Sequence, residues 1–218
     1  MRKIVVSAFI SLDGVMQAPG GPDEDPTGGF EHGGWIWPLF DETMNEALDA
    51  LFAQPFDLLL GRKTYDIFAA YWPHEGDGSI GSAFNRARKY VATGKPDMAL
   101  DWHNSRTLGA DVVEALRRLK QEDGPMLLTQ GSADFLQTLF RHGLVDELYM
   151  WVFPLVLGRG KTLFRDGAMP QTMKLIRSVA SGSGIVLNQY RPDGPVVTGS
   201  FASREPSEAE LERRRKLT

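Results

Sequence analysis

The sequence contains no cysteine, which excludes disulfide bonds, thiolate nucleophiles and cysteine-ligated metal sites. A chain without cysteine is expected by default in the reducing cytoplasm. Histidine is also scarce: the four histidines are scattered, and no His-Glu-x-x-His pattern joins two of them. We therefore expect a cytoplasmic protein without a metal site.

Long apolar runs and an excess of positive charge are missing too. No stretch approaches the roughly 18 apolar residues that a membrane-spanning helix needs. Residues 4–10 are apolar but too few for a secretory signal. The formal net charge is -4, and the one basic run, residues 213–216, has acidic neighbours. These features predict neither a membrane nor a nucleic-acid partner, so we expect a small-molecule partner.

Common nucleotide and hydrolase motifs are absent or lack their context. Gly160-Lys161-Thr162 matches the end of a phosphate-loop pattern, but the glycine needed five residues earlier is Leu155. No Gly-x-Gly-x-x-Gly fingerprint follows an expected strand, and no Gly-x-Ser-x-Gly elbow occurs. An ordinary Rossmann dinucleotide site and a serine-hydrolase site are therefore not expected.

What the sequence does contain favours one α/β domain. The chain has 218 residues, 42% of them apolar, which is enough for a substantial core. Expected strands cover residues 3–10, 57–60, 89–92, 105–108, 126–129, 147–154, 174–179 and 185–190, and expected helices cover 41–53, 65–70, 112–120, 134–142 and a segment capped by Ser207. This order predicts a mixed, mostly parallel sheet with helices on both faces and a C-terminal antiparallel hairpin.

The chain is organised around residues 125–164. A short strand is followed by a small-residue turn at residues 130–133, a helix that stops at Gly143, and a strand whose apolar faces are typical of the centre of a sheet. Ser132 is an expected N-cap, and a glycine turn at a helix N-terminus offers free backbone N–H groups to an anion. The alternative is that Gly131 and Ser132 only make a tight turn.

Residues 17–38 break every regular pattern, with glycines and prolines spread among aromatic residues. A long loop within a compact domain is often a lid or a binding loop, and the aromatic residues indicate that it packs over something. A flexible, disordered insertion is the alternative, because residues 19–29 are rich in glycine and proline. As a binding loop, it offers Gln17, Trp35 and Trp37 as candidate substrate-binding residues.

Small or basic residues at an expected helix start follow two of the strands. Residues 61–64 follow one strand and residues 131–133 follow another, while Ala92 and Thr93 end a third. In an open α/β sheet such ends converge on one crevice, where ligands bind. Two glycine turns at helix N-termini suit a ligand with separated phosphates, and Arg62 offers a forked contact to one more phosphate.

Four segments, in this order, resemble the reductase domain of riboflavin biosynthesis, within the dihydrofolate-reductase-like superfamily. They are VSAFISLDG (6–14), LLLGRKTY (58–65), TQGSADFL (129–136) and GLVDELYMWVFPLVLGRG (143–160), and the likeness spans residues 1–190. It is that of the C-terminal domain family of bacterial bifunctional deaminase-reductases. The resemblance implies the dihydrofolate reductase fold, NADPH as hydride donor and a homodimer.

The resemblance also implies the residues that hold the cofactor. They are Gly61, Arg62, Lys63 and Thr64 on the adenosine side, Gly131, Ser132 and Ala133 at the pyrophosphate, and Ala92 and Thr93 on the adenine-ribose side. Counting back from Gly61 places Asn45 where dihydrofolate reductases carry an acidic residue. The riboflavin reductase is often fused to a zinc deaminase, but this chain lacks the cysteines of such a half. We expect a stand-alone reductase domain over residues 1–195 and a charged C-terminal tail over residues 196–218.

Hydride addition to a C=N or C=O bond leaves negative charge that needs a proton, so an acid near the substrate is useful. Since Asn45 cannot serve as that acid, Asp13 is the first candidate. It lies in the turn after the first strand, at the same sheet end as the two glycine turns. Asp41, at the start of the next helix, is a second catalytic candidate. The alternative for Asp13 is simple capping of the turn before Gly14.

The sequence therefore predicts an NADPH-dependent reductase of a small heterocyclic substrate, similar to 5-amino-6-(5-phosphoribosylamino)uracil reductase. A reductase of a pterin or a carbonyl compound, and a nucleotide-binding domain without turnover, are the alternatives. Tyr149, Trp151 and Phe153 share one face of a strand, which favours a homodimer that covers them. The alternative is that the helix over residues 41–53 covers this face within the chain.

Overall fold

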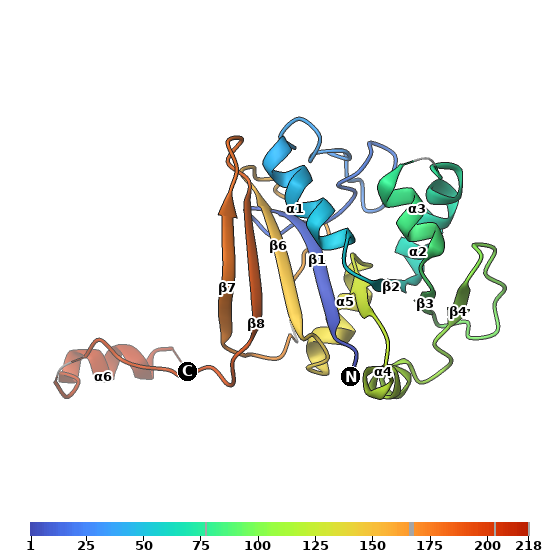
Figure 1. Cartoon of the computed structure of the whole chain (residues 1–218). Helices are drawn as coiled ribbons and strands as arrows, with labels where there is room; N and C mark the ends of the chain where they lie inside the picture. The colour runs from blue at the N-terminus through green and yellow to red at the C-terminus, as the bar shows by residue number, and fades with distance from the viewer. Residues whose placement is uncertain (77, 166–167, 203, 218) are drawn as a thin grey trace.

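The protein is described here by a computed structural model that covers residues 1–76, 78–165, 168–202 and 204–217. Its strands are β1 (Ile4–Ser11), β2 (Phe56–Gly61), β3 (Lys89–Ala92), β4 (Ser105–Thr107), β5 (Met126–Thr129), β6 (Glu147–Phe153), β7 (Met173–Ala180) and β8 (Val186–Pro192). They form one eight-stranded sheet in the order β4-β3-β2-β5-β1-β6-β8-β7 (Figure 1). All neighbours pair in parallel except β8 with β6 and β7 with β8. The mixed, mostly parallel sheet with a C-terminal antiparallel hairpin is confirmed.

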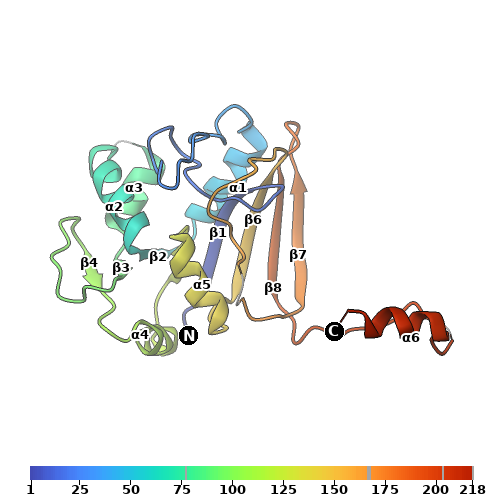
Figure 2. The same ribbon diagram turned by 180° about the vertical axis from the view of Figure 1, so that it is seen from behind.

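Helices cover both faces of this sheet. They are α1 (Glu42–Phe52), α2 (Arg62–Tyr71), the short η1 (Trp72–His74), α3 (Ser79–Arg86), α4 (Val112–Gln121), α5 (Ala133–Arg141) and α6 (Glu208–Arg215). The two opposite views show α1 on one side of the sheet and α5 on the other (Figures 1 and 2). Side chains of β1 alternate between the two faces. Ile4 and Val6 belong to the cluster that holds α4 and α5, whereas Val5 packs in the cluster that holds parts of α1, α2 and α3.

The helix α3 was not among the helices expected from the sequence. Its segment contains Gly81 and no side-chain cap, so its intrinsic helical signal is weak. Packing stabilises it instead: Phe84 is fully buried, with ring centroids 5.2 Å from Phe52 and 5.6 Å from Phe68. The helix thus forms because tertiary contacts outweigh local propensity.

The aromatic face of β6 is covered within the chain. Trp151 and Phe153 are fully buried, and the same cluster contains Met44 of α1 together with Trp35 of the loop over residues 17–38. Trp35 and Phe153 pack edge to face with ring centroids 5.2 Å apart. The intrachain alternative therefore holds for this face, and Phe30, Trp35 and Ile36 anchor the loop in this cluster, while most of residues 20–29 are exposed.

The tail leaves the body of the protein at the end of β8. Figure 1 shows α6 lying away from the sheet, and none of its residues is buried. Ser207 caps α6 as expected, and Glu210 pairs with Arg213 and Arg214 along the helix. In the part of the chain that the structure describes, no helix is long and apolar enough to cross a membrane.

Candidate functional site

Two glycine turns meet at the carboxyl ends of β2 and β5, which pair in parallel. The Gly61 N–H donates a hydrogen bond to the Gly131 carbonyl, at 3.0 Å. A Cβ on Gly131 would lie 2.6 Å from Thr64 Oγ1, and a Cβ on Gly61 would lie 2.7 Å from the backbone nitrogen of Ser132. Both distances are shorter than real Cβ contacts, so only glycine allows this approach. The peptide bond between Gly131 and Ser132 is cis.

The contact between the turns brings the N-termini of α2 and α5 together. Ser132 is the N-cap of α5, as the sequence indicated, and Gly61 is the N-cap of α2, which begins three residues before the expected helix over residues 65–70. Neither cap supplies a side-chain hydrogen bond to the first turn of its helix. The backbone N–H groups of these first turns therefore face the site without a side-chain acceptor, and the helix dipoles add positive potential. Two neighbouring helix ends of this kind suit two linked phosphates.

A cavity of about 600 Å³ opens beside these turns. One face of α1 forms a wall through Asn45, Leu48 and Phe52, which are spaced three and four residues apart. The cavity face of α2 forms the opposite wall, from Lys63 near its N-terminus to Tyr71 at its end. Residues 16–25 of the long loop complete the lining. The carboxyl ends of the strands thus hold a site with polar turns at one end and apolar helix faces at the other.

Five of the nine residues predicted to bind a cofactor line this cavity: Lys63, Thr64, Gly131, Ser132 and Ala133. The other four, Gly61, Arg62, Ala92 and Thr93, are not among the lining residues in the described part of the chain. They lie together at the ends of β2 and β3, where Gly61 stands opposite Ala92 in the parallel register. The structure therefore divides the predicted set into a group in the cavity and a group beside it.

Arg62 belongs to the group beside the cavity, and its guanidinium is held by neighbours. Its Nε donates to both carboxylate oxygens of Asp66, at 2.7 and 2.8 Å. Its Nη1 contacts the sulfur of Met98, which also accepts a long hydrogen bond from Thr93 Oγ1. Arg62 and Thr93 are thus joined through Met98.

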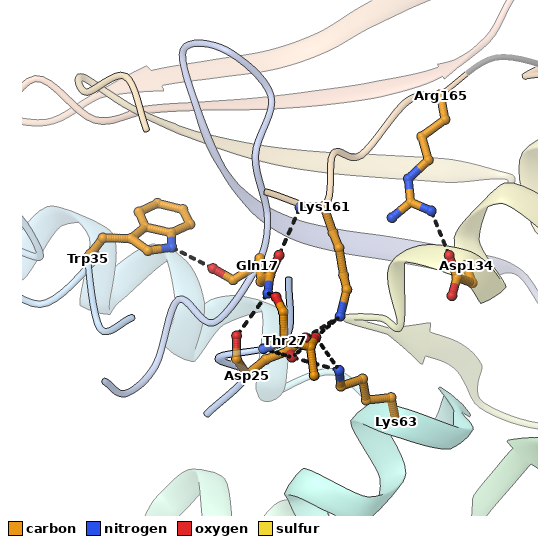
Figure 3. A network of polar contacts seen from close by, with 8 residues as sticks. All are labelled: Gln17, Asp25, Thr27, Trp35, Lys63, Asp134, Lys161 and Arg165. Atoms are coloured by element: carbon orange, nitrogen blue, oxygen red, sulfur yellow. Dashed lines mark hydrogen bonds and ion pairs between the residues drawn. The ribbon is translucent and has the colours of Figure 1, made fainter. Parts of the chain in front are cut away.

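An ionic cluster ties the long loop to the site (Figure 3). The Asp25 carboxylate, in a residue only 6% exposed, lies 2.6 Å from Lys63 Nζ and 2.5 Å from Lys161 Nζ. Both ammonium groups also donate to Thr27 Oγ1, at 2.9 Å. Because Lys63 starts α2 and Lys161 follows β6, one buried carboxylate joins three segments of the chain.

The charges of this cluster shift the pKa of each member. Burial alone would raise the pKa of Asp25, but hydrogen bonds from Lys161, Lys63 and Thr27 outweigh it and lower this pKa to about 2. Burial lowers the pKa of Lys161, and the nearby charge of Lys63 acts in the same direction. For Lys63, the Asp25 carboxylate outweighs burial and raises the pKa. Asp25 is therefore ionised at neutral pH and compensates one of the two lysine charges.

The three predicted substrate-binding residues are placed differently. Gln17 is buried in the cavity lining, and its side-chain amide donates to the backbone carbonyls of Asp25 and Thr27, at 2.8 and 2.9 Å. Trp37 lines the cavity with 63% of its surface exposed. Trp35 lies in the core, where its Nε1 donates to the Gln17 carbonyl at 2.8 Å. Gln17 and Trp37 thus line the cavity, and Trp35 holds the backbone of Gln17 from the core.

The two predicted catalytic carboxylates, Asp13 and Asp41, are not among the described residues that line the cavity. Asp13 accepts hydrogen bonds from the backbone N–H groups of Leu157 and Gly158, at 3.1 and 2.8 Å. Asp41 caps α1 and also accepts from the Ser183 N–H, at 3.1 Å. These contacts connect backbone segments, which favours the turn-capping alternative for Asp13. A catalytic role for either residue stays a prediction.

Sequence reasoning did not single out Glu24, Asp25 or Lys161. Glu24 lines the cavity, and its Oε2 accepts from the Gly20 N–H at 2.6 Å. Burial raises the pKa of this carboxyl. The sequence carried a weak signal for Asp25 and Glu24, acidic residues inside a glycine-proline loop. Lys161 was visible only as part of a rejected phosphate-loop pattern, because nothing local indicates that it reaches a loop more than a hundred residues away.

Comparisons with known proteins identify relatives over most of the chain. The family model of the RibD C-terminal domain matches residues 2–187. The uncharacterized protein YyaP of Bacillus subtilis (strain 168) is 25% identical over 197 residues, which make up 88% of this chain and 96% of that protein.

Three solved structures share the fold, each over 88% of this chain. A candidate riboflavin biosynthesis protein from Shewanella sp. PV-4 matches with a TM-score of 0.64, 19% identity and 99% of its own chain covered. Dihydrofolate reductase from Enterococcus faecalis, solved with NADP(H), matches with a TM-score of 0.56 and 14% identity, and 96% of its chain is covered. The third structure is a Thermotoga maritima diaminohydroxyphosphoribosylaminopyrimidine deaminase/5-amino-6-(5-phosphoribosylamino)uracil reductase. It matches with a TM-score of 0.56 and 18% identity, and 57% of its chain is covered. At these identities the likeness establishes the dihydrofolate-reductase-like fold alone.

Proposed function

The chain belongs to the RibD C-terminal domain family, and from this membership we propose that it is an NADPH-dependent oxidoreductase of a small heterocyclic substrate. The family and the fold support a reductase that uses a nicotinamide cofactor. The observation that carries the proposal is the contact between the two glycine turns, where added Cβ atoms would collide with Thr64 and Ser132. This contact presents two uncapped helix ends at one point beside a cavity.

These residues fit the cofactor. In the proposal, backbone N–H groups at the start of α2 and α5 bind the pyrophosphate, because they are free donors at positive helix ends. Arg62 binds the 2′-phosphate at the ends of β2 and β3, where its planar guanidinium can make a forked contact. When bound, NADPH supplies a hydride. The remainder of the cavity, between α1 and α2, is left for the substrate.

The substrate must also receive a proton. Hydride addition to the carbon of a C=N or C=O bond places negative charge on the heteroatom, and an acid within reach protonates it. Asp13 and Asp41 are the candidates from the sequence, and the backbone contacts of Asp13 favour its turn-capping alternative. Glu24 joins them from the geometry, because it lines the cavity where the substrate is proposed to bind.

Deuterium transfer from NADPH tests the proposed function. The protein is incubated with NADPH deuterated on one or the other face of the nicotinamide C4, together with a panel of pterins, aminouracils and cyclic ketones. A reductase transfers label from one face only, and mass spectrometry detects it in the product. Saturable NADPH binding with no label in any product would favour the alternative, a nucleotide-binding domain without turnover. Absence of NADPH binding would contradict the proposal.

The proposal includes a homodimer located in the cytoplasm. The strand β7 forms one edge of the sheet, and its exposed side chains include Leu175 and Ile176. An edge strand with apolar side chains is a ready template for pairing with a second copy. The dimer contact is thus assigned to β7 rather than to the aromatic face of β6, which the chain covers itself.

A further inference from the structure

The substrate end of the cavity has aromatic walls. Phe52 of α1 and Phe68 of α2 face it from opposite sides, and Phe84 of α3 packs against both. Tyr71 and Trp37 stand at its rim with 53% and 63% of their surfaces exposed. Exposed aromatic side chains gathered around one cavity are typical of a surface that a ligand covers. Rings of this kind stack on flat molecules and offer nothing to a phosphate.

The charged residues of the lining also disfavour a phosphate group on the substrate. Among the described lining residues there are four carboxylates, on Asp23, Glu24, Asp25 and Asp134, and only two cations, both lysines. Asp134 also pairs with Arg165, and the carboxylates remain in excess when that arginine is counted (Figure 3). The lining therefore offers a doubly charged phosphate ester no cation in excess of the acidic side chains.

The two lysines of the lining are not free to bind a phosphate group. Lys63 and Lys161 each hold one oxygen of the Asp25 carboxylate, and they share Thr27 Oγ1 as a further acceptor. The carboxylate thus takes up the forked contact that a phosphate group would need. It is fixed there, because the Asp25 and Thr27 carbonyls are held by Gln17. A phosphate would have to displace a buried, bonded carboxylate to reach either lysine.

A neutral polar group completes the substrate end. Asn45 is the polar residue on the cavity face of α1, next to Leu48 and Phe52. Its amide offers one donor side and one acceptor side but no charge. This pattern complements the lactam or amidine edge of an uncharged ring.

We propose that the substrate of this site is a planar, uncharged ring compound without a phosphate group, and that Asp25 excludes phosphate esters by occupying both Lys63 and Lys161. The inference rests on the proposed function, because it assigns the helix ends to the cofactor and the aromatic end to the substrate. It distinguishes this chain from the Thermotoga maritima reductase, whose named substrate carries a phosphoribosyl group.

A matched pair of probes tests the inference. 2-Naphthol and 2-naphthyl phosphate have the same ring, and at neutral pH only the second is charged. Calorimetric titration of the NADPH-saturated protein at physiological ionic strength should give a dissociation constant for 2-naphthol at least about tenfold below that of the phosphate ester. Tighter binding of the ester, or no binding of 2-naphthol up to its solubility, would overturn the proposal. This comparison needs no variant.

Two variants test the part assigned to Asp25. Asp25→Asn removes the charge that holds the lysines, so the preference for 2-naphthol should shrink by about fivefold or more. Asp23→Asn is the matched control, because it removes one charge from the same loop and lining, while both lysines stay paired with Asp25. The control should keep most of the wild-type preference. Equal preferences in wild type and Asp25→Asn, or equal losses in both variants, would show that Asp25 does not exclude phosphate esters.

The experiment distinguishes failure of this inference from failure of the proposed function. NADPH binding is measured first, and the probes are titrated both with and without NADPH. Protein that fails to bind NADPH refutes the proposed function, whatever the ranking of the probes. Protein that binds NADPH but prefers the phosphate ester refutes this inference and leaves the reductase proposal standing.

Discussion

Arg62 is the single residue on which the expected preference for NADPH depends. In the structure it is paired with Asp66 of its own helix, and both side chains are partly exposed. The doubly charged 2′-phosphate of NADPH is a stronger acceptor than this carboxylate, so it should take the guanidinium when the cofactor binds. NADH lacks that phosphate and gains nothing from Arg62.

We therefore expect Arg62→Ala to weaken NADPH binding by about 1.5–3 kcal/mol, or roughly tenfold to a hundredfold, and to leave NADH binding nearly unchanged. The control is Asp66→Asn, which removes an exposed pair worth about 0.3–0.5 kcal/mol and should strengthen NADPH binding by roughly twofold. Fluorescence titration with both cofactors gives the constants. Equal losses for NADPH and NADH would mean that Arg62 is structural.

Asp13 has two sequence interpretations, catalysis and turn capping, and its contacts favour the second. Its carboxylate accepts from two backbone N–H groups of the loop after β6, and Ser11 Oγ donates to it at 2.5 Å. These hydrogen bonds also lower the pKa of Asp13, with the Ser11 bond as the largest cause. A carboxylate engaged in this way is a poor proton donor.

We expect Asp13→Asn to keep NADPH binding and turnover but to lower stability by about 1 kcal/mol, because an amide cannot accept from both N–H groups as the carboxylate does. For a chain of this size that change corresponds to a melting temperature lower by about 2–4 °C. Calorimetry and NADPH consumption check the two parts. A folded variant with turnover reduced by about a hundredfold would restore Asp13 as the catalytic acid.

The loop over residues 17–38 contributes both to the site and to the stability of the folded protein, through the ion cluster of Asp25. The pKa of Asp25 in the folded protein is about 2, below its ordinary value of 3.8. A lowered pKa means that the ion cluster stabilises the folded state fully at pH values above 3.8, and that this contribution is lost as the pH falls toward 2. The loop should therefore be released in acid before the rest of the fold.

The matched experiment is a series of urea titrations of wild type and Asp25→Asn. At neutral pH the variant should be less stable by about 3 kcal/mol, because both lysines lose a buried partner. This difference should shrink as the pH falls from 3.8 toward 2, since the wild-type carboxylate then becomes neutral as well. A difference that stays constant across this range would contradict the assigned role of the cluster.

Elements with regular local patterns were predictable, and those made by distant contacts were not. The helices α1 and α4 carry capping aspartates and spaced apolar residues, and both were expected close to their observed bounds. The helix α3 is short, contains Gly81 and has no capping side chain, and it depends on the packing of Phe84. In the same way, residues 61–64 and 131–133 were recognised from glycine turns. The pairing of Asp25 with Lys161 could not be read from the sequence, because it joins two loops that carry no periodic pattern.

At the scale of the whole molecule, one edge of the sheet is exposed. Leu175 and Ile176 of β7 are 50% and 47% exposed, and a second copy paired along β7 would cover them. Sedimentation at micromolar concentration should give a mass of about twice 24.2 kDa. Ile176→Lys should shift the protein to the monomer without changing NADPH binding. A wild-type protein that sediments as a single 24.2 kDa species would exclude the dimer.

The central claim is that the paired glycine turns bind NADPH. Its most direct test is a titration of NADPH into the wild-type protein, followed by energy transfer from the tryptophans to the nicotinamide ring. Trp37 and Trp72 line the cavity, so a cofactor whose nicotinamide lies in it would be close to both. We expect saturable transfer with one NADPH per chain, reversed by NADP⁺. A titration without saturation, or transfer that NADP⁺ does not displace, would contradict it.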